Sequence, residues 1–511
     1  MRFVPQAARR RVLAKSATSR CLQLALVLLP ACLPAAIPFD ATNYRPGPIQ
    51  LRSTADAVTI EWSDEAHRPW TAEFSLDPKA PLIHAIKVNG ASVISSARPF
   101  YQCTTGKRRG GWDQFFDLPP SHPDGTRSFA GNLTPAYARA STIGDRLELA
   151  FTGMKMGIFQ GSVRYMFFPG SRLIEQVAVL VTNEPDTAYF YDAGLRMTVD
   201  DDKRVGGNME SYVTYYDTTG QVRTERSDGP EPHPVQARYR TIAARTGSGS
   251  VAVFPAPHQY FFPRDFTTNM GYLWHSAWKG VVSLGIRQLP DDATPYYPWS
   301  NAPTGSAQQM KMFLLLDPDT PQAALSDVLR FTNADRFPAV DGYITFAPHW
   351  HYAYTVQAME KGNSWVPPFK PVLQAMGVNA AMIMDFHGDG HPADTGEVRL
   401  RELAAYYEAC RAQSGKDFLL IPAEEANVYF GGHWALAFPK PVYWRMNASP
   451  SRPFRQQDPK YGTVYNAANT KDLLELVRAE NAFVYQTHPR TKGSMGYPDE
   501  SNYPPAKPGA L

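Results

Sequence analysis

Hydrophobic and polar positions alternate with a period of two over the first half of the chain, roughly residues 45 to 318. Val58, Ile60 and Trp62 are separated by polar residues, and Asn89-Gly90 provides a favoured hairpin turn. Further alternating faces are Ala72, Phe74 and Leu76; Leu147, Leu149 and Phe151; and Val177, Val179 and Val181. This period is typical of antiparallel strands with one buried face, so we predict a β-sandwich over residues 40–318.

After residue 319 the pattern changes to one of short apolar runs separated by helical periods. Thr320-Pro321 can cap and start a helix over residues 322–331, which we place in a linker at residues 319–338. Strands are predicted at residues 343–346, 378–384, 418–421 and 483–485. Helices are predicted after a cap at Asp394 or Thr395, through Leu400, Leu403, Ala404, Tyr407 and Cys410 to a stop at Gly415, and at residues 472–480. Alternating strands and helices predict a parallel sheet or barrel over residues 339–511.

The charge balance separates the N-terminus from the rest of the chain. The 511 residues include 51 Lys and Arg against 48 Asp and Glu, a formal net charge of +3. Six of the basic residues precede the first acid: Arg2, Arg9, Arg10, Arg11, Lys15 and Arg20. Without them the rest of the chain has 45 basic and 48 acidic residues. A slightly negative net charge does not attract a phosphate backbone. We therefore exclude nucleic acid as a partner.

The N-terminal segments follow one another in the order that is typical of an export signal. The basic stretch precedes an apolar run at residues 22–29 and small residues up to Ala36, so we predict a signal over residues 1–37 and a periplasmic or extracellular protein. Arg9-Arg10-Arg11 resembles a twin-arginine signal. A lipid anchor at Cys32 and an uncleaved amphipathic segment stay open as alternatives. Cys103 and Cys410 lie far apart and are predicted to be buried thiols.

Candidate metal ligands follow the predicted strands of the second half. They are His349 and His351 after the first strand, Asp385 and His387 after the second, Glu424, Glu425 and His433 after the third, and His488 after a later one. Strand ends of a parallel sheet share one rim, so we expect five of these side chains to converge within about 8 Å, with His387 facing the same cavity. The five are His349, His351, Glu425, His433 and His488. Two histidines two positions apart point to the same side of an extended segment. This donor set suits zinc, manganese or iron. For Asp389 and His391 a solvent-exposed loop is the favoured interpretation.

These motifs, in this order, resemble the PHP superfamily, named for polymerase and histidinol phosphatase domains. The resemblance rests on His349-x-His351, His387, the Ala423-Glu-Glu-Ala-Asn427 segment, Gly432-His433 and His488-Pro489. It implies a distorted (β/α) barrel whose two or three metal ions hydrolyse phosphoesters through a metal-bound hydroxide. In an exported branch similar to carbaryl hydrolases it implies other esters or amides. The implied metal ligands are His349, His351, His387, Glu425, His433 and His488, and the implied catalytic residues are Asp385 and His387.

The closing Asp-x-His motif of that family has no counterpart before Leu511, so we expect a PHP-like barrel that is incomplete at its C-terminus. An exported metal-dependent hydrolase with a small-molecule or glycan-derived substrate is the first hypothesis. The membrane would be contacted only through the signal or a lipid anchor.

The first half resembles the supersandwich domains of carbohydrate-active enzymes. Aromatic residues that could stack on sugars, although core packing is the favoured role for most, are Trp112, Phe115, Phe116, Tyr260, Phe261, Phe262 and Trp274. The second hypothesis is therefore a carbohydrate-binding β-sandwich protein with a degenerate, non-catalytic metallohydrolase domain. An extracellular scaffold without either activity is a third.

Overall fold

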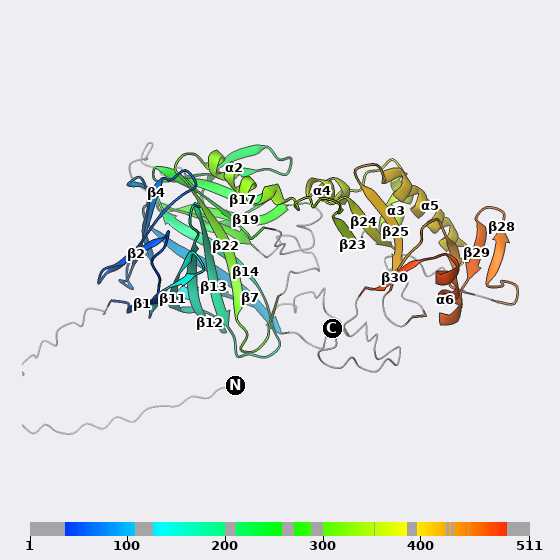
Figure 1. Cartoon of the computed structure of the whole chain (residues 1–511), viewed down its shortest axis with the longest axis horizontal. Coiled ribbons are helices and arrows are strands. Elements are labelled where there is room, and N and C mark those ends of the chain that lie inside the picture. The colour runs from blue at the N-terminus through cyan, green and yellow to red at the C-terminus, as the bar shows by residue number, and fades with distance from the viewer. Residues whose placement is uncertain are drawn as a thin grey trace, which may run out of the picture. The chain divides into compact units, whose positions relative to one another are not determined.

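The computed structural model describes residues 36–107, 126–199, 211–257, 270–287, 300–351, 353–385, 396–425, 429–430, 434–447 and 449–487. Apart from residues 36 and 37, the predicted export signal lies outside this part of the chain. Ile37 donates its backbone N–H to the carbonyl of Leu76 and packs in the hydrophobic core, so the folded domain includes it. Figure 1 shows a β-rich part followed by a part with mixed strands and helices, and the molecule is a multidomain, β-rich protein.

The N-terminal part is a continuous 22-stranded sheet that folds over into two layers. One layer runs, in order of pairing, through β1 (Phe39–Asn43), β10 (Ala138–Ile143), β11 (Arg146–Met156), β12 (Phe159–Phe167), β13 (Leu173–Val181), β22 (Gln308–Asp317), β18 (Gly249–Phe254), β17 (Gly229–Thr246), β15 (Ser211–Tyr216) and β16 (Val222–Ser227), with β9 (Asn132–Leu133) beside β11.

The other layer runs through β2 (Gln50–Ser53), β3 (Ala57–Ser63), β4 (Pro69–Ser75), β5 (Ile83–Val88), β7 (Ala97–Lys107), β14 (Thr187–Thr198), β20 (Val281–Arg287), β19 (Met270–Trp278) and again β17. At its margins lie β6 (Ala91–Ile94), β8 (Arg127–Ala130) and β21 (Ser300–Ala302).

Aromatic side chains from the two layers interlock to form the core. The ring of Phe74 on β4 lies 5.8 Å from Phe151 on β11 and 5.0 Å from Tyr165 on β12. Burying rings of this size gives each of them about 1.5–3 kcal/mol relative to exposure. The β-rich character predicted for the first half is thereby confirmed. The turn prediction also holds, because Asn89 and Gly90 have φ angles of 50° and 81° between β5 and β6.

One long strand, β17, passes from one layer to the other. Its first half pairs with β19 and its second half with β18 and β15. At the bend Tyr239 and Arg240 have φ angles of 61° and 52°, which are uncommon for residues with side chains. The buried Arg240 guanidinium forms an ion pair with Asp335 at 2.7 Å, in the short 3₁₀ helix η3 (Asn333–Asp335). This contact fixes the bend where the strand changes sheets.

The face predicted at Val177, Val179 and Val181 is wrong by one residue. On β13 the fully buried side chains are Ile174, Gln176, Ala178 and Leu180, whereas Val179 and Val181 are partly exposed. Both faces of this central strand are apolar, so alternation alone could not choose between them.

The helix predicted over residues 322–331 is present as α2 (Pro321–Phe331). The side chain of Thr320 accepts a hydrogen bond from the backbone N–H of Ala323 at 3.2 Å, as expected of an N-cap. Ala324, Leu325 and Val328 pack on Leu315 and Phe254 of the sandwich. The helix therefore belongs to the sandwich core.

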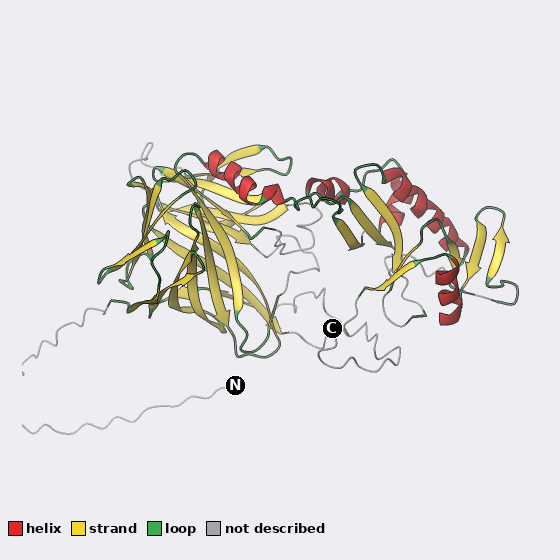
Figure 2. Ribbon diagram, in the orientation of Figure 1, coloured by secondary structure: helices red, strands yellow, loops and turns green. Residues whose placement is uncertain are grey.

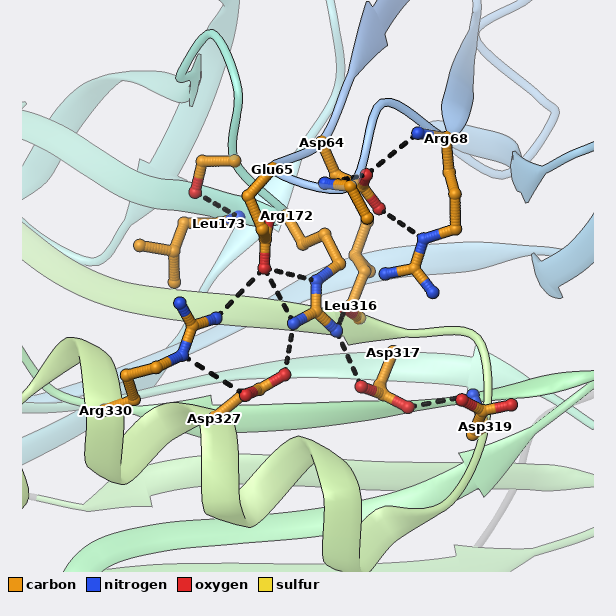
Figure 3. A network of polar contacts seen from close by, with 12 residues as sticks. Asp64, Glu65, Arg68, Arg172, Leu173, Leu316, Asp317, Asp319, Asp327 and Arg330 are labelled. Atoms are coloured by element: carbon orange, nitrogen blue, oxygen red, sulfur yellow. Dashed lines mark hydrogen bonds and ion pairs between the residues drawn. The ribbon is translucent and has the colours of Figure 1, made fainter.

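A buried ion network joins α2 to the sandwich (Figure 3). The guanidinium of Arg172, only 4% exposed, contacts Asp317 at 2.6 Å and Glu65 at 2.9 Å, and it also pairs with Asp327 of α2. Arg330, more than half exposed, reaches Glu65 at 3.0 Å. One buried cation thus neutralises carboxylates from three separate segments.

The C-terminal part contains most of the helices, as Figure 2 shows. Its five-stranded sheet has the order β23 (Phe346–Trp350), β24 (Ala380–Asp385), β25 (Leu419–Glu425), β26 (Trp434–Ala437) and β30 (Phe483–Gln486). The helices are α3 (Tyr354–Lys361), α4 (Phe369–Ala375), α5 (Glu397–Gln413) and α6 (Thr470–Ala479). A small second sheet has the order β27 (Tyr443–Arg445), β29 (Gly462–Asn466) and β28 (Arg455–Asp458).

The five-stranded sheet is mixed rather than parallel throughout. β23, β24 and β25 are parallel, β26 is antiparallel to β25, and β30 is antiparallel to β26. Two reversals give β30 the direction of β25, so the carboxyl ends of four strands share one rim. The described strands form an open sheet, and a closed barrel is not seen among them.

Two predicted boundaries in this part need correction. The first strand begins at Phe346 rather than at Tyr343, because Tyr343 and Ile344 are 79% and 67% exposed. Helix α5 begins at Glu397 with Gly396 at its N-cap, and the predicted caps Asp394 and Thr395 lie outside the described residues. The apolar face of α5 is otherwise as predicted, with Ala404 less buried than the rest.

Candidate metal centre

Three predicted ligands meet at the carboxyl rim of the five-stranded sheet. His349 is the fourth residue of β23, His351 follows that strand, and Glu425 is the last residue of β25. The two histidines share a side because they are two positions apart in an extended segment. The carboxylate of Glu425 is fully buried, and the side chains of His349 and His351 are 22% and 33% exposed.

The donor atoms of these three residues lie close enough together to bind one ion. The Nε2 atoms of His349 and His351 are 2.7 Å apart, and each lies 2.9 Å from Oε2 of Glu425. Ligands at about 2.1 Å from one ion and at right angles are separated by about 3 Å. The arrangement is therefore that of three donors facing one small cation.

The hydrogen bond on the outer side of His351 identifies the tautomer of its neutral ring. Its Nδ1 lies 2.9 Å from the carbonyl oxygen of Met384, which only accepts, so Nδ1 carries a proton. In the neutral ring Nε2 then presents a lone pair toward the Glu425 carboxylate. Two lone pairs at this distance repel unless a positive charge lies with them. A backbone carbonyl on the outer nitrogen is also the usual second contact of a metal-bound histidine.

The end of β30 reaches the same site. Thr487 donates its hydroxyl to Oε1 of Glu425 at 2.7 Å, which fixes the carboxylate so that Oε2 faces the histidines. Tyr485 donates to the carbonyl of Pro348 at 2.6 Å and so holds β30 next to β23. Burial raises the pKa of Tyr485 to about 12, with the charge of Glu425 adding to it, so the phenol stays protonated.

The structure separates the two adjacent glutamates, because neighbouring residues of a strand point to opposite faces. Glu424 accepts a hydrogen bond from Nε1 of Trp444 at 3.0 Å and pairs with the buried guanidinium of Arg399. Arg399 also stacks on the Trp444 ring at 4.3 Å. Glu424 therefore contributes to the packing of α5, whereas Glu425, the better match to the motif, faces the two histidines.

Asp385, predicted to be catalytic, has a different set of partners. It is fully buried and accepts hydrogen bonds from the backbone N–H groups of Tyr354 and Thr355 at 3.2 and 2.6 Å and from the Thr355 hydroxyl at 2.6 Å. The N-cap position of α3 is Ala353, which has no side-chain acceptor. Asp385 replaces the missing cap and fixes the segment that follows His351, so its contacts are those of a positioning residue.

We expect Asp385→Asn to lower the free energy of unfolding by about 1–2 kcal/mol, because the amide has only one acceptor oxygen for three donors. It should also weaken metal binding moderately, since α3 begins directly after His351. Chemical denaturation and metal titration measure the two effects. Asp472→Asn at the exposed start of α6 is the control, and equal behaviour of both variants would contradict the assignment.

The remaining predicted residues cannot be placed. His387, His433 and His488, together with Asp389 and His391, lie outside the described residues. Thr487 and Trp434, their chain neighbours at the rim, belong to the described part. The structure thus brings together three of the six predicted ligands, and metal binding itself stays a prediction.

A second cluster escaped the sequence analysis. Glu225, His233 and His275 come together on the sandwich, each offering one donor atom within 4.8 Å of the others. Burial lowers the pKa of His275, although the neighbouring Glu225 opposes the shift. No local motif links residues from three strands, so only the pairing of β17 with β19 reveals the cluster.

Two other sequence expectations are tested by burial. Cys103 and Cys410 are buried free thiols, as predicted, and burial raises the pKa of Cys103 to about 12. Trp274 is 1% exposed and packs in the core, so it does not present a sugar-binding face. The other aromatic residues proposed for that role lie outside the described residues.

In the part of the chain that the structure describes, no helix is long and apolar enough to cross a membrane.

Comparisons with known proteins assign no family. No protein-family model matches the sequence, and no curated protein matches it. A galactose mutarotase related enzyme from Lactobacillus acidophilus is 10% identical, covering 52% of this chain and 97% of its own, with a TM-score of 0.24. An alpha-galactosidase from Geobacillus stearothermophilus is 8% identical, covering 76% and 51%, with a TM-score of 0.27. A glycosyl hydrolase family 38 protein from Enterococcus faecalis is 8% identical, covering 58% and 34%, with a TM-score of 0.27. Likeness at this level supports no assignment.

Proposed function

We propose that this protein is a metal-dependent hydrolase acting on an ester, phosphoester or amide bond. The observation that carries the proposal is the convergence of His349, His351 and the buried Glu425 with their donor atoms 2.7–2.9 Å apart. A divalent cation bound there would balance the charge of the buried carboxylate.

The residues fit a divalent ion by their chemistry. Two imidazoles and one carboxylate form the donor set of open catalytic zinc sites, and manganese or iron accepts the same ligands. An ion held there would polarise a substrate oxygen and activate water near neutral pH. Met384 and Thr487 provide the outer contacts that hold His351 and Glu425 in orientation.

The exposed fractions of the two imidazoles indicate where substrate enters. Glu425 is buried, whereas His349 and His351 are partly open to solvent at the strand ends, so the ion would be accessible from the rim. Ligand sites of open α/β sheets lie outside the carboxyl ends of the strands. We further propose a PHP-like relationship for this part, with His387, His433 and His488 as additional ligands, and export as the cellular route.

The test uses the full-length protein stripped with a chelator and reloaded with zinc, manganese or iron. We expect reloading to restore hydrolysis of at least one of p-nitrophenyl phosphate, bis-p-nitrophenyl phosphate, p-nitrophenyl acetate and an amino-acid p-nitroanilide. His349→Ala combined with His351→Ala should lose activity together with the metal ion bound at this centre. His84→Ala, at an exposed histidine of the sandwich, is the matched control. A purified protein that binds none of these ions would overturn the proposal.

A further inference from the structure

Three strands of the sandwich bring Glu225, His233 and His275 onto one face. His233 on β17 and His275 on β19 are directly opposite each other in the antiparallel pairing, and their ring centroids are 5.0 Å apart. Glu225 on β16 places Oε1 3.0 Å from Nε2 of His275. Residues opposite one another on adjacent strands are held at a fixed separation, so the cluster is part of the rigid sheet.

Two members of the cluster, His275 and Glu225, are each held by an outer contact. The hydroxyl of Ser227 lies 2.8 Å from Nδ1 of His275, and the phenol of Tyr215 donates to Oε2 of Glu225 at 3.0 Å. Because a serine hydroxyl can accept a hydrogen bond from Nδ1–H, the neutral ring can present the lone pair of Nε2 toward Glu225. Burial and the Glu225 carboxylate raise the pKa of Tyr215 to about 12, so the phenol remains a donor at neutral pH.

The burial of the three residues is graded from the core to the surface. His275 is 2% exposed, Glu225 is half-buried and His233 is exposed. If His275 had only a structural role, its hydrogen bonds with Ser227 and Glu225 would be sufficient, and His233 would not be needed. A cation site uses all three, and the exposed side of His233 leaves solvent access and an open position.

We propose that Glu225, His233 and His275 form a second divalent-cation site of the zinc class on the sandwich, independent of the centre on the five-stranded sheet. The donor set is two imidazoles and one carboxylate, with Ser227 and Tyr215 as the residues that orient it. The cation would join β16, β17 and β19 and stabilise the bent strand β17 in place.

The experiment is zinc titration of the full-length protein against a chromophoric chelator in a background that already carries His349→Ala and His351→Ala. This background separates the sandwich site from the proposed catalytic centre. We expect it to retain zinc binding, and we expect zinc to raise its thermal midpoint. Adding His233→Ala should weaken that binding by at least about 100-fold, and adding Ser227→Ala should weaken it by about 10–100-fold.

His233 is exposed, so its alanine variant removes a donor without opening the core, and circular dichroism checks the fold. His84→Ala in the same background is the control and should bind zinc unchanged. Zinc binding that is the same with and without His233→Ala would refute the site, because the ion would then lie elsewhere. A background that binds no zinc would refute it equally, whatever the wild-type protein binds.

Discussion

Replacing Glu425 with glutamine is expected to weaken metal binding at the His349–His351 centre by at least about 100-fold. Loss of an outer-shell partner alone typically costs about 10–100-fold, and in the proposed centre Glu425 would be the buried anionic ligand itself. The amide keeps the size of the side chain but removes the charge that balances a divalent ion. Competition titration with a chelator measures the affinity, and metal content per chain gives the stoichiometry.

The matched control for this variant is Glu73→Gln. Glu73 also lies near a histidine, His84, at 3.9 Å, but both side chains are exposed, so its loss should leave metal affinity unchanged. A Glu425→Gln protein that binds metal as tightly as the wild type would remove the carboxylate from the ligand set. The hydrolase proposal would then lose the observation on which it rests.

Replacing Arg172 with methionine is expected to lower the free energy of unfolding of the sandwich by about 3–5 kcal/mol. The guanidinium is buried and pairs with Asp317, Glu65 and Asp327. Its removal leaves the buried Asp317 without this cation and leaves Glu65 and Asp327 with the more exposed Arg330. Denaturation followed by tryptophan fluorescence measures the loss. Arg52→Met is the control, since Arg52 is 74% exposed in its pair with Glu61 and should cost less than about 1 kcal/mol.

The difference in free energy of unfolding between Arg172→Met and the wild-type protein should become smaller in acid. Burial acts to raise the pKa of Glu65, but its hydrogen bonds and the charge of Arg172 prevail and hold that pKa below its ordinary value. A lowered pKa contributes stability above the unfolded value of about 4.3, and this is lost as the pH falls through the folded value. The variant lacks that contribution, so the two proteins should differ less below about pH 4 than at pH 7. A pH-independent difference would contradict the electrostatic explanation.

Local patterns along the chain were sufficient for several elements. Alternation at Val58, Ile60 and Trp62 identified a strand and its buried face, and Asn89-Gly90 identified the turn between β5 and β6. Thr320-Pro321 gave the start of α2. In each case the physical cause lies within a few neighbouring residues: side-chain period, positive φ or a cap.

The centre could be predicted in part for the same reason. His349 and His351 point to the same side because they are two positions apart in an extended strand. Their position at the end of that strand predicted that they lie at the carboxyl rim of the sheet. The sequence could not tell that Asp385 caps α3, since that depends on Ala353 lying in the left-handed region beside the end of β24. The choice between faces of β13 was missed because both faces are apolar.

The sequence by itself determined the periodicity of strands and helices, the helix caps and the turn. It also determined that His349 and His351 point to the same side. Neighbouring positions along the chain are sufficient to impose these features. Tertiary structure decided the bend of β17, the reversal of β26 that returns β30 to the rim, and the meeting of His233 with His275. Strand order and register are long-range choices, settled by which buried faces pack together. No spacing along the chain encodes them.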